Sequence, residues 1–128
     1  MRILGIDYGS KHIGLAVSDE SRTIARELGV FSPKEFWQKL AGIVTEQNIK
    51  RVVVGLPIGL RGQNTKSTEA AQKFIDKLKK KNQAPVETVD ERFTTDLAKR
   101  LGGGHGHHDS LVAQILLQEY LNKNSSKP

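Results

Sequence analysis

The chain has no cysteine among its 128 residues, so neither disulfide bonds nor thiolate metal sites are available to it. Aromatic residues are scarce at 5%, and no apolar run approaches the roughly 20 residues of a membrane-spanning helix. Acidic residues are also in deficit, 14 against 20 lysines and arginines, which leaves a net charge of +6 and a pI near 9.7. We therefore expect a soluble, cytoplasmic protein with no membrane segment and no signal peptide. Its charge favours an anionic partner such as nucleic acid.

The length predicts one folding unit. A chain of 128 residues can bury one hydrophobic core, but it is too short for two lobes around a cleft. We expect a single domain over residues 1–121 and a polar C-terminal tail over residues 122–128.

The first structured stretch runs from Ile3 to Ser10 and has the sequence Ile-Leu-Gly-Ile-Asp-Tyr-Gly-Ser. A short apolar run that ends in turn residues predicts a buried strand with Asp7 at its end. The alternation from Ile13 to Val17 predicts a second strand, antiparallel to the first. Asp7 is then either a functional carboxylate at the mouth of a hairpin or a residue that only caps the turn.

The middle of the chain alternates strand and helix patterns. A third strand is expected over 23–31, and Ser32-Pro33-Lys34-Glu35 has the cap, first-turn proline and glutamate of a helix start. The β-branched run 52–54 predicts a central strand parallel to the first and covered on both faces. The loop 58–64 should then cross the carboxyl edge of the sheet, where Arg61 either meets a phosphate or is simply solvated. A helix from Thr65 ends in a lysine run typical of a solvated, dipole-compensating helix end.

The last third places more acids at the ends of elements. Residues 86–91 alternate as a strand that ends in Asp90 and Glu91, and a short helix carrying Leu97 and Leu101 should follow. Residues 102–108, rich in glycine and histidine, predict a flexible linker, with adventitious metal binding or phosphate contact as a lesser alternative. Helical spacing puts Asp109 on one face with Val112, Ala113 and Leu116 of the most apolar helix, although aspartate is also a preferred helix cap.

Three acids, Asp7, Glu91 and Asp109, thus mark two strand ends and one helix start. In a parallel arrangement these ends converge on one sheet edge. Converging carboxylates repel each other unless a cation lies among them, and oxygen ligands suit Mg²⁺ or Mn²⁺. Such ions can activate water and stabilise the leaving oxygen in phosphodiester hydrolysis. An acidic metal site in a basic protein suits a polyanionic substrate.

Four motifs in order make the chain resemble the YqgF/RuvX family over nearly its whole length. They are Leu4-Gly5-Ile6-Asp7-Tyr8-Gly9 with Ile13-Gly14-Leu15-Ala16-Val17-Ser18-Asp19, Val54-Gly55-Leu56-Pro57, Val89-Asp90-Glu91-Arg92-Phe93-Thr94-Thr95, and Asp109-Ser110-Leu111-Val112-Ala113-Gln114-Ile115-Leu116-Leu117. The resemblance implies a ribonuclease H-like α/β fold, and we expect a mixed five-stranded sheet with helices on both faces. By the match, Asp7, Glu91 and Asp109 correspond to the family's acidic active-site triad.

The function that the resemblance implies is a metal-dependent nuclease, with Mg²⁺ or Mn²⁺ as its cofactor. We expect it to process the pre-16S rRNA end, in contact with ribosomal precursor particles, with Lys11, Arg61 and Arg92 on the carboxylate rim as candidate phosphate contacts. Two alternatives stay open: a Holliday junction resolvase acting on branched DNA, and a nucleic-acid-binding module without activity. An ATPase of the actin and sugar-kinase type shares the hairpin motif but needs two lobes. A stable homodimer would favour junction resolution, and a monomer would favour RNA trimming.

The chain departs from the family pattern in four places. Lys11-His12 stands where many members carry arginine, Val112 replaces a common alanine, and the glycine and histidine segment is short and lacks the expected basic residues. Related resolvases add a further acid or histidine one helical turn before the last acid, and that position here is Gly106.

Overall fold

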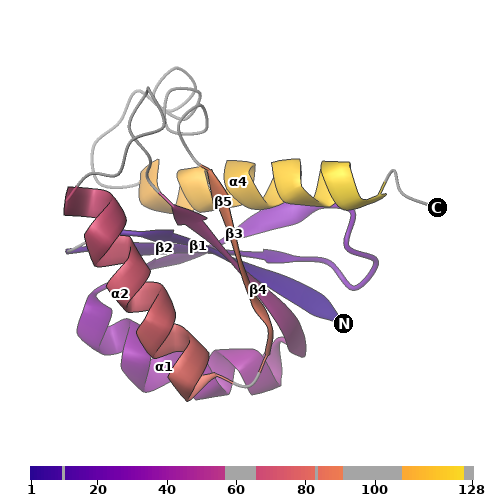
Figure 1. Ribbon diagram of the computed structural model, residues 1–128. Helices are drawn as coiled ribbons and strands as arrows, with labels where there is room; N and C mark the ends of the chain where they lie inside the picture. The colour runs from indigo at the N-terminus through magenta and orange to yellow at the C-terminus, as the bar shows by residue number, and fades with distance from the viewer. Residues whose placement is uncertain (10, 57–65, 83, 91–107, 126–128) are drawn as a thin grey trace.

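Five strands form one mixed sheet in the order β3-β2-β1-β4-β5 (Figure 1). The computed structural model describes residues 1–9, 11–56, 66–82, 84–90 and 108–125. β1, β4 and β5 are parallel, whereas β2 is antiparallel to β1 and β3, which confirms the predicted mixed sheet. The elements are β1 (Arg2–Tyr8), β2 (Ile13–Ser18), β3 (Ala25–Phe31), α1 (Pro33–Glu46), β4 (Ile49–Leu56), α2 (Lys66–Lys81), β5 (Val86–Asp90) and α4 (His108–Ser125).

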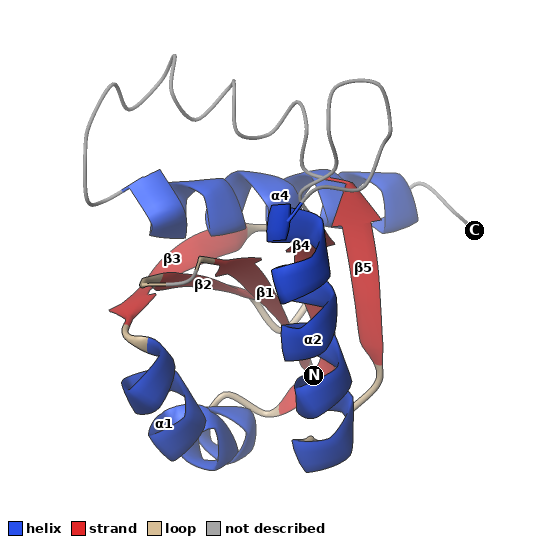
Figure 2. Ribbon diagram, turned by 60° about the vertical axis from the view of Figure 1, so that its left-hand side comes forward, coloured by secondary structure: helices blue, strands red, loops and turns tan. Residues whose placement is uncertain are grey.

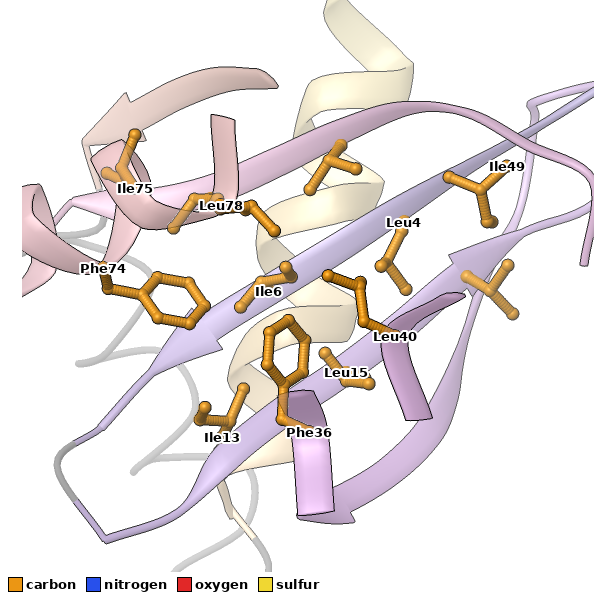
Figure 3. Close-up of a cluster of buried hydrophobic side chains, with 13 residues drawn as sticks. Leu4, Ile6, Ile13, Leu15, Phe36, Leu40, Ile49, Phe74, Ile75 and Leu78 are labelled. Atoms are coloured by element: carbon orange, nitrogen blue, oxygen red, sulfur yellow. The ribbon is translucent and has the colours of Figure 1, made fainter. Parts of the chain in front are cut away.

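Helices cover both faces of the sheet, as predicted. α1 and α2 lie on one face and α4 crosses the other (Figures 1 and 2). Each face has its own hydrophobic core, and β4 contributes to both, since Val52 and Val54 belong to the α1/α2 core and Val53 to the α4 core. Figure 3 shows the α1/α2 core, with side chains of the two helices pointing at those of β1 and β2. Burying each large apolar side chain there contributes roughly 1.5–3 kcal/mol.

α1 begins as its sequence predicts. The backbone N–H of Glu35 donates to Ser32 Oγ at 3.2 Å, and the backbone N–H of Ser32 donates to Glu35 Oε1 at 3.1 Å, so the capping box is complete. Pro33 occupies the first turn, where no N–H is needed. The bond from the Ser32 N–H lowers the pKa of the Glu35 carboxyl, because it stabilises the charged form.

β3 starts at Ala25, two residues later than expected, because Asp19 organises the chain before it. The Asp19 carboxylate accepts the backbone N–H groups of Thr23 at 2.8 Å and Ile24 at 3.2 Å, together with the Ser21 hydroxyl at 2.8 Å. These bonds keep the pKa of Asp19 well below its usual range. Arg22 adopts a left-handed φ of 58° in the same turn. The backbone N–H groups of Thr23 and Ile24 therefore bond to Asp19 and not to a neighbouring strand.

α4 continues to Ser125, so the helix includes the first four residues of the expected polar tail. No proline or glycine interrupts residues 122–125, and Gln118 Nε2 donates to Asn122 Oδ1 at 3.1 Å, one turn along the helix. Amide pairs at this spacing stabilise a helix, which composition alone did not indicate. Among the described helices, none is long and apolar enough to cross a membrane.

Candidate active site

Asp7 lies at the carboxyl end of β1 on the face that α4 covers. Side chains alternate along a strand, and Ile3 packs in the α4 core while Leu4 and Ile6 pack in the α1/α2 core. Asp7 shares the parity of Ile3, and it is half-buried. Its partners in the two neighbouring strands are Gly14 of β2 and Gly55 of β4. Both cross-strand partners of Asp7 are therefore residues without a side chain.

α4 crosses β1 at unusually close range over Gly5. A Cβ built on Gly5 would lie 2.9 Å from Leu117 Cβ and 3.3 Å from the Ala113 carbonyl oxygen, so only glycine fits without movement. Farther along the helix, Tyr120 Oη accepts a hydrogen bond from Arg51 Nη1 at 2.9 Å, and Arg51 pairs with Ile3 at the start of β1. α4 therefore runs opposite to β1, and its first turn lies at the end of β1 that carries Asp7 (Figure 1).

A ladder of three polar side chains anchors α4 to the edge strand. Ser110, Gln114 and Gln118 follow one another at intervals of one helical turn. The Ser110 hydroxyl donates to Glu27 Oε1 at 2.7 Å, and Gln114 Nε2 donates to the Ala25 carbonyl at 3.2 Å.

Gln118 completes this ladder by pairing with backbone at two points. Its Oε1 accepts the Ala25 N–H at 2.8 Å, and its Nε2 donates to the Thr23 carbonyl at 2.9 Å. These bonds satisfy backbone groups of Ala25 that an edge strand would otherwise leave open. They also fix α4 on the sheet.

Asp109 is the second residue of α4, one turn before Ala113, which lies over Gly5. Its backbone position therefore belongs to the helix stripe over the sheet, at the end of β1 where Asp7 lies. Val112, Ala113 and Leu116 are buried, as the expected helix face requires. Asp7 and the position of residue 109 thus share one face and one end of the sheet.

The remaining acid of the predicted triad, Glu91, lies outside the described residues. It directly follows β5, whose last residue Asp90 pairs with Leu56 at the carboxyl end of β4. Within the part of the chain that the structure describes, no group of three or more histidine and acidic side chains could hold a metal ion.

Of the basic residues predicted to contact phosphate, the structure describes Lys11. It is exposed in the turn between β1 and β2, at the same end of the sheet as Asp7. The turn is tight, since a Cβ on Gly9 would lie 2.6 Å from the His12 carbonyl oxygen. Arg61 and Arg92 lie outside the described residues, as do the expected helix carrying Leu97 and Leu101 and residues 102–107 of the predicted linker. His108, the last residue of that linker, is the first residue of α4.

The sequence patterns did not reveal the polar ladder of Ser110, Gln114 and Gln118. The signal that could have found it is the spacing of these residues, four positions apart in an otherwise apolar helix. Residues at this spacing share one face of the helix, so they can bond to the same neighbouring strand. The partners come from β3, more than 80 residues away in the sequence, and no local pattern identifies them.

Comparison of the sequence with known proteins identifies the family of the chain. A model of the RuvX family, described as Holliday junction resolvase, matches residues 1–123. The chain belongs to the RuvX family. It is 38% identical over 136 residues to a Dictyoglomus turgidum protein described as "Putative pre-16S rRNA nuclease", which covers 98% of this chain and 96% of the relative. A Caldanaerobacter subterraneus protein with the same description is 38% identical over 139 residues, 98% of this chain and 100% of the relative.

The same fold occurs in a solved resolvase. Thermus thermophilus RuvC, determined in complex with a Holliday junction substrate, matches with a TM-score of 0.58 at 18% identity, over 98% of this chain and 97% of that chain. This RuvX chain therefore has the ribonuclease H-like fold of the RuvC resolvases, and both the family and the fold implied by its motifs are confirmed.

Proposed function

We propose that this RuvX protein is a divalent-metal-dependent nuclease that trims precursor 16S ribosomal RNA, with Asp7, Glu91 and Asp109 as metal ligands. One observation carries the proposal: Asp7 and the first turn of α4 lie together at the carboxyl edge of the sheet. Open α/β sheets bind ligands at this edge. We infer the substrate from relatives that match over nearly their full length and are described as "Putative pre-16S rRNA nuclease".

The residues fit a hard divalent cation. Carboxylate oxygens are the ligands that Mg²⁺ and Mn²⁺ prefer. The cross-strand partners of Asp7 are glycines, and the lack of side chains at these two positions favours the approach of an ion and a phosphate. Glu91 has the strand parity of Glu87 and Val89, of which Val89 packs on the α4 core, so the alternation of β5 predicts the same face for it. When bound, the ion would supply Lewis-acid activation of the phosphate and of water. Asp7 and Asp109 would hold it from the sheet and the helix.

The basic residues then act on the substrate backbone. Lys11 is exposed beside the Asp7 end of β1, where its ammonium group can contact a phosphate next to the scissile bond. Arg61 and Arg92 follow β4 and β5 in the sequence, and they would add further phosphate contacts. The net charge of +6 favours association with RNA through the backbone, without selecting a sequence.

The decisive variant is Asp7→Asn, measured on a pre-16S rRNA fragment in Mg²⁺ and in chelator. Loss of one ligating carboxylate should cost about 3 kcal/mol or more of transition-state stabilisation, on the order of a hundredfold in rate. The metal-free variant should melt no lower than wild type, because asparagine keeps the shape and removes a charge from a cluster of like charges.

The matched control is Asp76→Asn on α2. Asp76 is exposed on the opposite helical layer and accepts a hydrogen bond from Gln72 at 3.2 Å, so its loss should leave cleavage unchanged. Cleavage retained in Asp7→Asn would reject the ligand assignment. A sharply lowered melting temperature of that variant would reassign Asp7 to a structural role.

The family description favours a second substrate, branched DNA. Junction resolution needs two coordinated cuts, so it requires a dimer with paired sites. A labelled four-way junction assayed beside the RNA fragment, together with sedimentation of the protein, separates the two: a monomer that cleaves RNA alone supports trimming, and a dimer that cuts the junction symmetrically supports resolution.

A further inference from the structure

A groove of about 680 Å³ opens at the other end of the molecule from Asp7. It lies where the second half of α1, the start of β4, the end of α2 and the segment before β5 meet. Its lining residues are Trp37, Leu40, Ala41, Val44, Thr45, Ile49, Lys50, Lys81, Asn82, Ala84 and Pro85. Ile49 is at the amino end of β4 and packs in the α1/α2 core, so the groove is on the face of the sheet that the proposed active site does not use.

The groove combines an apolar floor with a cationic rim. Ala41, Val44 and Pro85 present apolar surface above the buried side chains of Leu40 and Ile49, and Lys50 and Lys81 are exposed at the rim. α2 carries six lysines and two acids, and its last turn holds three of the lysines and no acid. The potential at this end of the helix layer is therefore positive, and it selects an anionic partner with apolar side chains.

The tryptophan of the groove is arranged for packing and not for stacking on a nucleobase. Lys77 Nζ lies 4.5 Å from the centre of the Trp37 ring, and the rings of Phe36 and Phe74 lie 4.9 and 5.3 Å from it. Proteins that bind single strands present open aromatic faces. With its ring engaged by Lys77 and both phenylalanines, and with aliphatic residues around it, this groove suits leucine-like side chains better than bases.

We propose that this groove docks an acidic amphipathic helix of a partner protein. Apolar side chains of that helix would enter between α1 and α2, and its carboxylates would pair with Lys50 and Lys81. This is the helix-in-groove mode of peptide recognition, in which the apolar face supplies affinity and the charged rim supplies selectivity. The docking is separate from RNA cleavage, and it would let the enzyme bind RNA and a protein partner at opposite ends.

Trp37 is the only tryptophan of the chain, so its fluorescence reports directly on the groove. The full-length protein is titrated with a short synthetic helix that has leucines on one face and glutamates on the other, in the absence of RNA and metal. We expect a shift of Trp37 emission that saturates, and binding that weakens as salt is added. The titration is repeated with a single-stranded RNA oligonucleotide as the competing class of ligand.

Four variants separate docking in the groove from general charge attraction. Lys50→Glu and Lys81→Glu should each weaken peptide binding about threefold to tenfold, while Lys73→Glu, an equal change at an exposed α2 position outside the groove lining, should have little effect. Ala41→Arg adds a cation at an exposed lining position. It should weaken binding by filling the groove, whereas it would strengthen binding driven by charge alone.

Each contrary outcome overturns the proposal. No saturable emission shift with the peptide shows that the groove does not dock such a helix. Equal losses in all three lysine variants, or tighter binding by Ala41→Arg, show general electrostatic attraction. Tighter binding of the RNA oligonucleotide, with the same shift of Trp37 emission, assigns the groove to nucleic acid. Because all titrations omit metal and RNA cleavage, their failure leaves the proposed nuclease function untouched.

Discussion

Replacing Gly5 with alanine tests the close approach of α4 to β1. The added Cβ would lie 2.9 Å from Leu117 Cβ, the first atom of a side chain, and 3.3 Å from the Ala113 carbonyl oxygen, a backbone atom. Neither atom can rotate away. α4 is also held by the ladder of Ser110, Gln114 and Gln118, so the helix has to shift as a body or the strand has to bend. Overpacking of this kind costs roughly 1–3 kcal/mol.

The expected effect is large enough to measure by thermal unfolding. With an unfolding entropy of about 2 cal/mol/K per residue, each kcal/mol should correspond to about 4 °C in a chain of this length. Gly5→Ala should therefore melt about 4–11 °C below wild type. It should also lose cleavage activity, because α4 carries Asp109 and moves away from Asp7.

The same chemical change at Gly42 is the control. Gly42 lies inside α1, and a Cβ built on it meets nothing within 4 Å. Gly42→Ala should stabilise the protein by about 0.5–1 kcal/mol, since alanine loses less backbone entropy on entering a helix. A Gly5→Ala variant that melts with wild type, or above it as Gly42→Ala should, would show that α4 does not pack this closely on β1 in solution.

Two further predictions concern the anchor of α4 and the turn before β3. Ser110→Ala removes the hydrogen bond to Glu27; because Ser110 neighbours Asp109, kcat should fall while KM changes little, and Ser110→Thr, which keeps the hydroxyl, should retain more activity than alanine. Equal kcat values for the alanine variant and wild type would contradict a positioning role. In the turn, the pKa of Asp19 is lower in the folded state than in the unfolded state, so the charged carboxylate stabilises the folded state. This stabilisation is complete above the unfolded-state pKa of about 4, and it is lost as the pH falls toward the folded-state pKa. The melting temperature of Asp19→Asn should thus be below wild type at pH 7 and approach it below about pH 4; a pH-independent difference would show that charge is not involved.

Local signals in the sequence predicted the elements whose causes are themselves local. The start of α1 needs only Ser32, Pro33 and Glu35, which are close in sequence, and all three act in the structure as their spacing indicates. The run 52–54 predicts an interior strand covered by helices on both faces, because its residues are apolar on both faces. The structure confirms this, with Val53 in one core and Val52 and Val54 in the other.

Signals failed where a side chain competes for backbone groups. Residues 23–24 look like the start of a strand, but Asp19 takes the N–H groups of Thr23 and Ile24 before a ladder can form, and Ile24 stays exposed. The end of α4 was expected too early for a different reason, a hydrogen bond between two side chains. Asn122 appears to be a tail residue from its polarity, and only its pairing with Gln118 shows that it prolongs the helix.

The sequence predicts Asp7, Glu91 and Asp109 as a set, since the ends of parallel strands and the start of the last helix are expected at one edge. The structure describes Asp7 and the backbone of residue 109, and the full set stays a prediction. The distance between its members could not be predicted, because it depends on how closely α4 approaches β1. That approach depends on Gly5, which has no side chain, and on the hydrogen bonds of the ladder between α4 and β3. Gly5 and the β3 partners are all more than 80 positions from α4 in the sequence. A motif match identifies such residues one by one, and the contacts between them appear only in three dimensions.

The two anchors of α4 also bear on the unusual sequence before it. Four of the five residues 102–106 are glycine, a composition that contributes little to fixing the start of a helix. Gly5 and the ladder lie on β1, β3 and α4 themselves, so the place of residue 109 relative to Asp7 follows from the packing of the helix on the sheet. The packing of α4 on the sheet thus accounts for the backbone position of residue 109. The departure of the segment before the helix from the basic composition expected for the family should therefore alter the grip on the substrate backbone, a property measured by KM and by salt dependence, while the assembly of the acidic site is left intact.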